Sequence, residues 1–358
     1  MALAVAACGG SPTSTSTPQP NAAGAPSAAS QLWDGLAGAE RERVLLEAAK
    51  KEGRLSVYSG FNDEPAMAEA FTKKYGIEVD VYNANSETVL QRILQERSAG
   101  KTLNDVLIAP SPDINAAQDE GLLGTYESPY RDAISNGGKS EQWTAVRRLA
   151  FVAGWNTDNV KTEELPEDYS GFADPVWAGR ISLELADFDW YATLFDYYVE
   201  AGKSEQEVQE MFQAIAANSN TVKGHTVQGQ FLAAGQFDVA LSLYTQTVER
   251  LEVKGAPVTY GADKGKVVEP VVVRYDAGGL MKTPNNPATA TLYLDFQLSE
   301  DGFAVDEALG ALPPIPQEGE RLGDAKIVEL DTPAFVERRA DLSAQYQELI
   351  LRAGTQVG

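Results

Sequence analysis

Hydrophobic and polar residues follow two spacing patterns along the chain, and these patterns predict helices and strands in turn. In ERERVLLEAAKKEG apolar residues recur every three or four positions, as in an amphipathic helix, whereas IEVDVYNA has the period of two that is typical of a strand. Asp63 and Ser86 are predicted to cap the helices that they open, and Gly53 and Gly76 to end the helices before them. The elements predicted for this part are helix 40–53, strand 54–60, helix 64–76, strand 77–84, helix 86–100 and strand 105–112. This order predicts a parallel sheet with helices on both faces.

A second unit of the same kind is predicted further along the chain. Its elements are strand 180–187, helices 189–202, 204–218 and 226–236, strand 237–244 and a helix over 245–255. Between the units, the apolar segment 145–160 is predicted to be a strand that crosses from one lobe to the other, and 267–282 a strand that returns. A helix pair over 284–310 and a helix over 331–354 follow. Two α/β lobes joined by crossing strands bind ligands in the cleft between them and close by a hinge motion.

The composition narrows the possible functions. At 358 residues the chain is long enough for two lobes, and its mean hydropathy of -0.26 is typical of a globular protein. Acidic residues outnumber basic ones by 52 to 29, and the resulting net charge of -23 argues against binding to nucleic acid or anionic lipid. Cys8 is the only cysteine and His225 the only histidine. No internal disulfide can therefore form, and a zinc site or a Ser-His-Asp triad would have to include His225.

The first residues predict where the protein is located. VAAC (5–8) resembles a bacterial lipobox, so residues 1–8 are interpreted as a truncated lipoprotein signal with lipidation at Cys8. The short apolar run lacks a basic region, which is consistent with a start codon further upstream; an accidental cysteine in a tail is the alternative. Residues 9–32 are rich in Ser, Thr, Pro, Gly and Ala and are predicted to form a flexible tether. This layout predicts a protein of the cell envelope, extracytoplasmic and lipid-anchored to a membrane.

Four segments together resemble one protein family. They are RLSVYSGFNDEPAMAEAFTKKYGIEVDVYNANSETVLQRI, DVLIAPSPDINAAQDEGLL, GHTVQGQFLAAGQFDVALSLY and GGLMKTPNNPATATLYLDFQLSEDG. The chain resembles the extracellular solute-binding proteins of ABC importers, and among them the ferric-ion-binding periplasmic branch, related to binders of thiamine, polyamines and phosphonates. The resemblance implies a type II periplasmic-binding-protein clamshell, an α/β fold in which each lobe is a sheet flanked by helices and the ligand lies in the cleft between the lobes. We expect the lobes to comprise 33–147 plus 268–316 and 148–267 plus 317–358.

Candidate ligand contacts stand where predicted strands end and helices begin, because helix N-termini offer free N–H donors. Ser59, Asn62 and Ser111 occupy two such positions in the first unit. Iron-binding relatives commonly have a histidine near Asn62 and a glutamate at Pro110, and this chain has neither. The alternative roles are a capped loop at the first position and a plain proline turn at the second.

A third junction, at 187–191, offers charge and aromatic rings. Asp187 and Asp189 would attract a metal ion or an ammonium group if they face the cleft, whereas anion-binding relatives have small residues there. Helix capping is the alternative role of Asp189. Trp190 and Tyr191 are candidates for stacking on an organic or cationic ligand, or for packing in the core.

Tyr244, at the end of a predicted strand, is the main candidate for ligand contact. Iron-binding relatives typically have two adjacent tyrosines here because paired phenolates suit Fe³⁺, whereas Thr245 follows in this chain. Tyr275 is the candidate for a second phenolate, so that Tyr244 and Tyr275 form the expected metal set. Arg274 is suited to hold a ligand carboxylate or phosphate, or to form a structural ion pair. His225, which precedes a helix, is either a cleft donor or a structural residue.

The sequence therefore predicts a monomeric, membrane-tethered solute-binding protein that delivers its solute to an ABC permease, with no cofactor and no chemistry of its own. Ferric iron is the transported ligand that the resemblance implies first. A small organic solute (a phosphonate or carboxylate, a polyamine or a thiamine-like molecule) is the alternative, because the expected histidine, glutamate and adjacent tyrosine are missing. An extracellular enzyme is less favoured, since no nucleophile–base pair is apparent outside His225. A purely structural lipoprotein is also less favoured, since polar and aromatic residues gather at several strand ends.

Overall fold

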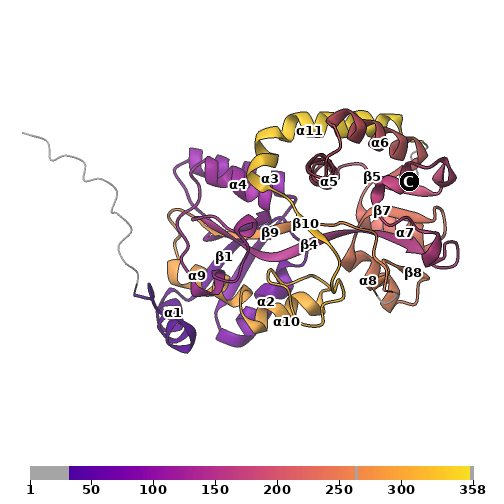
Figure 1. The fold of residues 1–358 in the computed structure, drawn as a ribbon. Helices are drawn as coiled ribbons and strands as arrows, with labels where there is room; N and C mark the ends of the chain where they lie inside the picture. Colours follow the sequence, from indigo (N-terminus) through magenta and orange to yellow (C-terminus); the bar gives the residue numbers. More distant parts are fainter. Residues whose placement is uncertain (1–31, 263–264, 355–358) are drawn as a thin grey trace, which may run out of the picture.

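The computed structural model describes residues 32–262 and 265–354 and shows two α/β lobes that share a pair of long strands (Figure 1). The strands of the first lobe are β1 (Arg54–Ser59), β2 (Glu78–Asn83) and β3 (Val106–Pro110). Its helices are α1 (Gly38–Glu52), α2 (Glu64–Tyr75), α3 (Ser86–Ser98), α4 (Ser111–Asp119), α9 (Pro287–Gln297) and α10 (Glu300–Ala308). These elements confirm the predicted alternation of strands and helices in this unit.

The second lobe repeats the architecture. Its strands are β5 (Ile181–Glu184), β6 (Ser219–Val222), β7 (Val239–Tyr244), β8 (Val258–Thr259) and β10 (Ile327–Glu329). Its helices are α5 (Phe188–Glu200), α6 (Glu205–Asn218), α7 (His225–Ala233), α8 (Thr245–Val253) and α11 (Thr332–Arg352). Short 3₁₀ helices lie at Pro129–Arg131, Asn136–Gly138, Thr162–Glu164, Tyr169–Ala173 and Pro175–Trp177.

Two long strands, β4 (Trp143–Asn156) and β9 (Val271–Leu280), connect the lobes. The hydrogen-bonded strand order is β2-β1-β3-β9-β4-β7-β5-β6, with β1 parallel to β2 and β3, and β5 parallel to β6 and β7. The strands β4 and β9 pair antiparallel with each other, and every residue of β4 is buried because both of its faces are covered. The two-lobe clamshell with crossing strands is thus confirmed, while the residue bounds proposed for each lobe stay predictions.

Helix α11 is the element that ties the two lobes together at the C-terminal end of the chain (yellow in Figure 1). Phe335, Leu342 and Tyr346 on this helix pack into the core of the second lobe. At its start, the hydroxyl of Thr332 forms a 2.9 Å hydrogen bond with that of Ser111, the first residue of α4 in the first lobe. None of the helices in the described ranges combines the length and the apolar character needed to cross a membrane.

Helix ends largely follow the capping residues of the sequence, with two corrections. Gly53 and Gly76 end α1 and α2 in the left-handed conformation, at φ 78° and 72°, as predicted. Asn85 rather than Ser86 caps α3, because Asn85 has the extended backbone of a cap and its side chain accepts a 2.8 Å hydrogen bond from the Thr88 N–H. Asp63 precedes α2 but forms no capping bond; its carboxylate instead lies 3.2 Å from Arg250 on α8, across the cleft.

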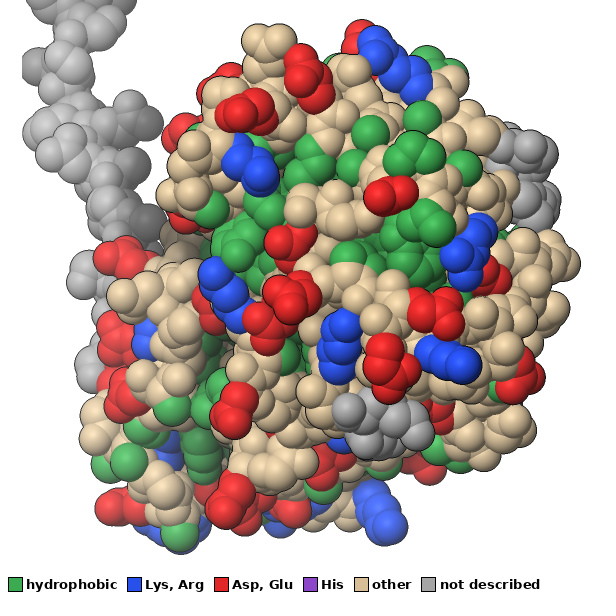
Figure 2. Space-filling model, turned by 45° about the vertical axis from the view of Figure 1, so that its right-hand side comes forward, with side chains coloured by type: hydrophobic (Ala, Val, Ile, Leu, Met, Phe, Trp, Pro, Cys, Tyr) green, Lys and Arg blue, Asp and Glu red, His purple; other side chains and the backbone are tan. Residues whose placement is uncertain are grey.

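Acidic side chains are common on the surface, in agreement with the acidic composition. On the face shown in Figure 2, acidic side chains are spread among fewer basic ones, and hydrophobic side chains gather in patches between them. On this face the acidic side chains are therefore dispersed rather than gathered in one patch.

Candidate functional site

A cavity of about 300 Å³ lies between the lobes, where strands end and helices begin. The first lobe contributes Pro110, Pro112 and Asp113 at the start of α4. The second lobe contributes residues from the end of β5, the end of β7 and the starts of α5 and α7, namely Glu184, Ala186, Asp187, Phe188, Asp189, His225 and Tyr244. Arg274 from β9 and Phe335 and Arg339 from α11 complete the lining. This location in the cleft agrees with the position expected of a ligand site in two-lobe α/β folds.

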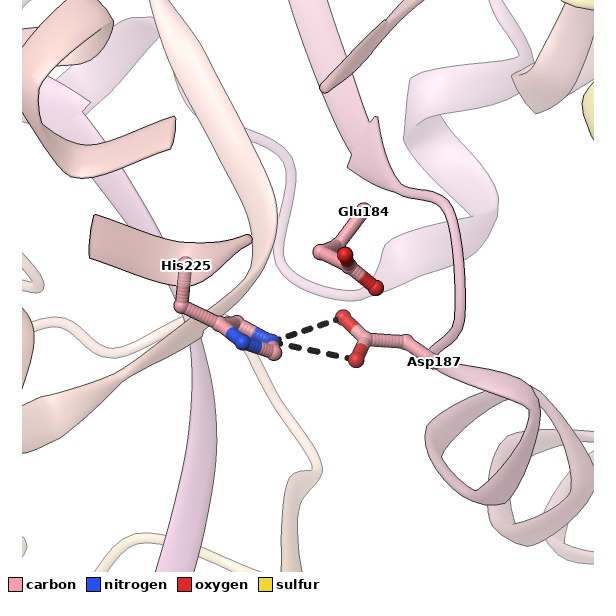
Figure 3. A group of neighbouring side chains, drawn as sticks. All are labelled: Glu184, Asp187 and His225. Carbon is pink, nitrogen blue, oxygen red and sulfur yellow. Dashed lines mark hydrogen bonds and ion pairs between the residues drawn. The ribbon is translucent and has the colours of Figure 1, made fainter. Parts of the chain in front are cut away.

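Three side chains in this wall form a compact cluster, shown in Figure 3. Nε2 of His225 lies 3.0 and 3.1 Å from the two carboxylate oxygens of Asp187, and Glu184 lies beside Asp187. One ligand atom from each of the three residues can be chosen so that all lie within 4.8 Å of one another. Carboxylate oxygen and imidazole nitrogen at this spacing are a donor set for a metal cation.

Local backbone structure explains why these three residues meet. Glu184 is the last residue of β5, Asp187 immediately precedes α5, and His225 opens α7. Gly224 adopts φ 87°, a left-handed conformation that favours glycine, and its N–H donates a 2.8 Å hydrogen bond to Glu184. The turn that starts α7 therefore holds both His225 and the carboxylate of Glu184 in place.

The cluster perturbs the protonation of its own members. Burial raises the pKa of Glu184, and the neighbouring charge of Asp187 raises it further, while the hydrogen bond from Gly224 opposes this shift. Burial alone would lower the pKa of His225, but the carboxylates of Asp187 and Glu184 more than offset that effect, so the pKa lies above its ordinary value. The site thus carries negative charge in excess, and this charge favours a proton or a metal cation at its centre.

Tyr244 lies directly against this cluster. Its ring stacks on the imidazole of His225, with ring centroids 3.7 Å apart and an interplanar angle of 21°, and Phe151 packs edge-on against it at 5.0 Å. Burial raises the pKa of Tyr244 well above its ordinary value, although the charge of Arg274 acts in the opposite direction. The predicted junction is present, because β7 ends at Tyr244 and α8 begins at Thr245.

Arg274 and Asp189 form a partly buried ion pair at the edge of the cavity. Nη1 of Arg274 lies 2.6 Å from a carboxylate oxygen of Asp189, whose other oxygen accepts a 2.9 Å hydrogen bond from the Trp190 N–H. The expectation that Asp189 caps α5 is corrected, because α5 begins at Phe188 and Asp189 is its second residue. Because the charge of Asp189 is matched by Arg274, the carboxylates left for a cation are those of Glu184 and Asp187.

The aromatic residues predicted to stack on a ligand lie elsewhere. Trp190 and Tyr191 are 0% and 1% exposed and pack in the core of the second lobe, where both rings contact Phe212 edge-on. Their assignment as ligand contacts is corrected to core packing, because the face of α5 that carries them points away from the cavity wall.

Tyr275 also lies away from Tyr244. Successive residues of a strand point to opposite faces, so Arg274 lines the cavity while Tyr275 packs in the core of the first lobe. Its hydroxyl is hydrogen-bonded to Glu329 at 2.6 Å and to Ser135 at 3.0 Å. The pair Tyr244 and Tyr275 is therefore corrected as a metal set: a single phenol reaches the cavity from these two residues.

The remaining candidates have other positions. Ser59 is buried and its hydroxyl accepts a 3.1 Å hydrogen bond from the Phe61 N–H, while Asn62 is exposed in the loop before α2. Ser111 is buried in its contact with α11, and Thr245 is buried at the start of α8. None of these four lines the 300 Å³ cavity. Cys8 and most of the proposed tether lie outside the described residues.

Three charged residues of the cavity were not predicted from the sequence: Glu184, Asp113 and Arg339. Glu184 lies inside the predicted strand 180–187, and only the structure shows that β5 ends at this residue, three residues before Asp187. Asp113 and Arg339 form a 3.0 Å ion pair between the lobes. Their pairing joins helices 226 residues apart in the chain and had no local signal.

Comparison with known proteins gives the class of protein. Residues 102–320 match the family of bacterial extracellular solute-binding proteins, and the chain belongs to this family. Its members bind solutes outside the cytoplasm, so this chain is an extracytoplasmic solute-binding protein. This finding confirms the family that the sequence segments resemble.

Individual relatives narrow the comparison further. Iron uptake protein A1 of Synechocystis sp. is 22% identical over 279 residues, which cover 75% of this chain and 77% of the relative. The structure of FutA from Trichodesmium in complex with iron and citrate has a TM-score of 0.66 at 20% identity, covering 83% of this chain and 99% of that one. AfuA from Actinobacillus pleuropneumoniae with bound fructose-6-phosphate also scores 0.66, at 19% identity and with 84% and 99% coverage. Structural similarity at this level of identity establishes the fold and leaves the solute to be argued from the site.

Proposed function

We propose that this protein is the solute-binding component of an ABC importer and captures ferric iron in the inter-lobe cavity. The observation that carries the proposal is the cluster of Glu184, Asp187 and His225, whose ligand atoms lie within 4.8 Å of one another. The ring of Tyr244, stacked on His225, brings a phenol to the same wall. Carboxylate and phenolate oxygens are hard anionic donors that suit Fe³⁺.

The charge of the cavity wall and the names of two relatives also support ferric iron as the ligand. The pair between Arg274 and Asp189 leaves Glu184 and Asp187 to share the single imidazole of His225, and this excess of carboxylates favours a cation over an anion. A curated relative is named an iron uptake protein, and another, from Serratia marcescens, is named an Fe(3+)-binding periplasmic protein. The metal is the transported solute here, bound by residues of the second lobe and covered by Pro110, Pro112 and Asp113 of the first.

The rest of the function follows from this role. The lobes close around the metal, and the membrane subunits of the permease bind this closed conformation. Reopening of the lobes then releases the solute. The protein acts as a monomer, catalyses no reaction, and is held at the membrane by a lipid on Cys8. A lipid anchor keeps the loaded protein near the permease and thereby raises its effective concentration there.

Titration with Fe³⁺, supplied as a weak chelate, tests the proposal. We expect an increase in melting temperature and a phenolate-to-iron absorption band in the visible region, because Tyr244 must lose its proton to bind the metal. The variant Tyr244→Phe should lose the band. If the wild type binds Fe³⁺ without the band, Tyr244 is not a ligand; if Fe³⁺ does not bind at all, the iron proposal is wrong.

The shape of the cavity favours one alternative, a small organic cation. A volume of about 300 Å³ exceeds the space of a bare ion, and Phe188, Phe335 and the two prolines give the cavity an apolar side. A polyamine or thiamine-like molecule could place its charge on Asp187 and Glu184. A thermal-shift panel of amines, phosphonates and carboxylates distinguishes the two cases, since a shift with an amine and none with Fe³⁺ would select the organic solute.

A further inference from the structure

A second group of buried charges lies apart from the cavity, where β4 and β9 cross between the lobes. It consists of Glu64 at the start of α2, Arg147 on β4, Asp276 on β9 and Asp306 on α10, and these four residues are called the floor network below. Their exposed fractions are 0%, 4%, 2% and 0%. Arg147 and Asp276 are partners in the register of β4 with β9. The network thus joins two helices of the first lobe to both crossing strands.

The ion pairs of the floor network are long for buried charges. Nη2 of Arg147 lies 3.8 Å from Glu64, and its Nε lies 3.7 Å from Asp306. By comparison, the buried pair between Arg41 and Asp295 in the same lobe closes to 2.6 Å. Nε and Nη2 of Arg147 and both carboxylate oxygens of Asp306 are buried without a hydrogen-bond partner. Leaving such groups unpaired destabilises a conformation, so small displacements that pair them are favourable.

The floor network is connected to the cavity wall by a chain of charges. Asp276 lies 3.8 Å from Nη2 of Arg274, and Nη1 of the same guanidinium is paired with Asp189 at the start of α5. A displacement of Arg147 along β4 therefore has a route through Asp276 and Arg274 to the second lobe. Both intermediate residues lie on β9, one of the two strands that connect the lobes, where a hinge rotation must be absorbed.

We propose that the floor network is a proton-sensitive hinge device. Protonation of Asp306 determines whether Arg147 pairs with Glu64 or is drawn to Asp306, and this choice shifts the balance between open and closed lobes. Arg147 forms ion pairs with Glu64 and Asp306, while Asp276 is shared between Arg147 and Arg274, whose charge is already matched by Asp189. Full ionisation thus leaves the network with excess negative charge, and a proton on Asp306 relieves it.

The direction of the pH effect follows from the groups that face Asp306. These are Arg147 on β4, Glu64 on α2, Asp276 on β9 and Asp63 in the loop before α2. Burial raises the pKa of Asp306 to about 7, Arg147 opposes this shift, and the three carboxylates add to it. The folded protein therefore holds a proton that the unfolded chain releases at lower pH. Stability from this group is present at acidic pH and is lost as the pH rises to about 7.

The test compares the wild type with Asp306→Asn, which keeps the shape of the side chain and removes its titration, in the absence of any solute. Urea unfolding and the radius of gyration from small-angle X-ray scattering are measured from pH 5.5 to 8. One extra bound proton makes the unfolding constant of the wild type rise by up to about tenfold per pH unit below pH 7. We expect this rise to be smaller in Asp306→Asn, and the radius of gyration to change with pH in the wild type alone.

Two further variants make the result decisive. Glu307→Gln changes an exposed carboxylate on the same helix and should behave like the wild type. Glu64→Gln removes one negative neighbour of Asp306 and should move the wild-type transition to lower pH. Equal pH dependence of unfolding in the wild type and Asp306→Asn would overturn the proposal. So would a change in stability with identical radii of gyration at every pH, because the cluster would then stabilise the first lobe without acting on the hinge.

Discussion

The cavity wall and the floor network are both buried groups of carboxylates around one nitrogen base, yet they differ in what they can bind. In the wall the base is His225, in direct contact with Asp187 at 3.0 Å, and the group faces a cavity of about 300 Å³. In the floor network the base is Arg147, 3.7 Å from Asp306 and outside the lining of that cavity. Imidazole can lose its proton and become a ligand, whereas a guanidinium stays charged at any ordinary pH. Acidic residues alone therefore do not identify a metal site; the base and the space beside it decide.

The largest effect on stability is expected when a carboxylate is removed from the floor network. Glu64→Ala should lower the free energy of unfolding by about 3 kcal/mol, because it leaves Arg147 buried without one of its carboxylates and also removes the acceptor for Tyr293 and Gln297. Chemical unfolding measures the loss. Glu69→Ala, an exposed position on the same helix, is the control and should change stability little. A loss equal to the control's would show that the floor network carries no stability.

Removing a carboxylate from the cavity wall should instead affect metal binding more than stability. Asp187→Asn should weaken Fe³⁺ binding by about 100-fold or more, since even outer-shell partners of metal ligands are worth 10- to 100-fold. Its effect on unfolding of the metal-free protein should be smaller than that of Glu64→Ala. Competition with a chelator gives the affinity, and Asp196→Asn on the exposed side of the same helix α5 serves as the control. Unchanged affinity in Asp187→Asn would remove this residue from the metal site.

The smallest effect is expected at Tyr275, the tyrosine that the fold separates from the cavity. Tyr275→Phe should cost about 1 kcal/mol of stability, because its hydroxyl is hydrogen-bonded to Glu329 and Ser135. The iron absorption band should be unchanged, in contrast to its loss in Tyr244→Phe. A weaker or shifted band in Tyr275→Phe would restore this residue as a ligand and contradict the placement of β9.

Much of the site could be located from local patterns. The period-two segment that ends at Tyr244 and the polar helix after it predict the junction of β7 and α8, and the same reasoning placed Asp187 and His225 at helix starts. These features depend on residues within a few positions of one another, so the sequence displays them directly. The sequence did not show which of two adjacent side chains faces the cleft. Trp190 follows Asp189 by one residue, but packing of α5 turns it into the core.

The sequence by itself determined the alternation of strands and helices and the strand-end positions of the candidate ligands, because both depend on short-range periodicity and capping. The family was indicated by the resemblance of four segments to known solute-binding proteins. Tertiary structure decided which of those positions share a cavity. It brought Glu184 to Asp187 and His225, separated Tyr275 from Tyr244 by the alternation of side chains along β9, and assembled the floor network from four distant segments. Contacts of this kind depend on the register of β4 with β9 and on the packing of helices against them. No local pattern encodes that register, since it is set by the balance of all the packing interactions in both lobes.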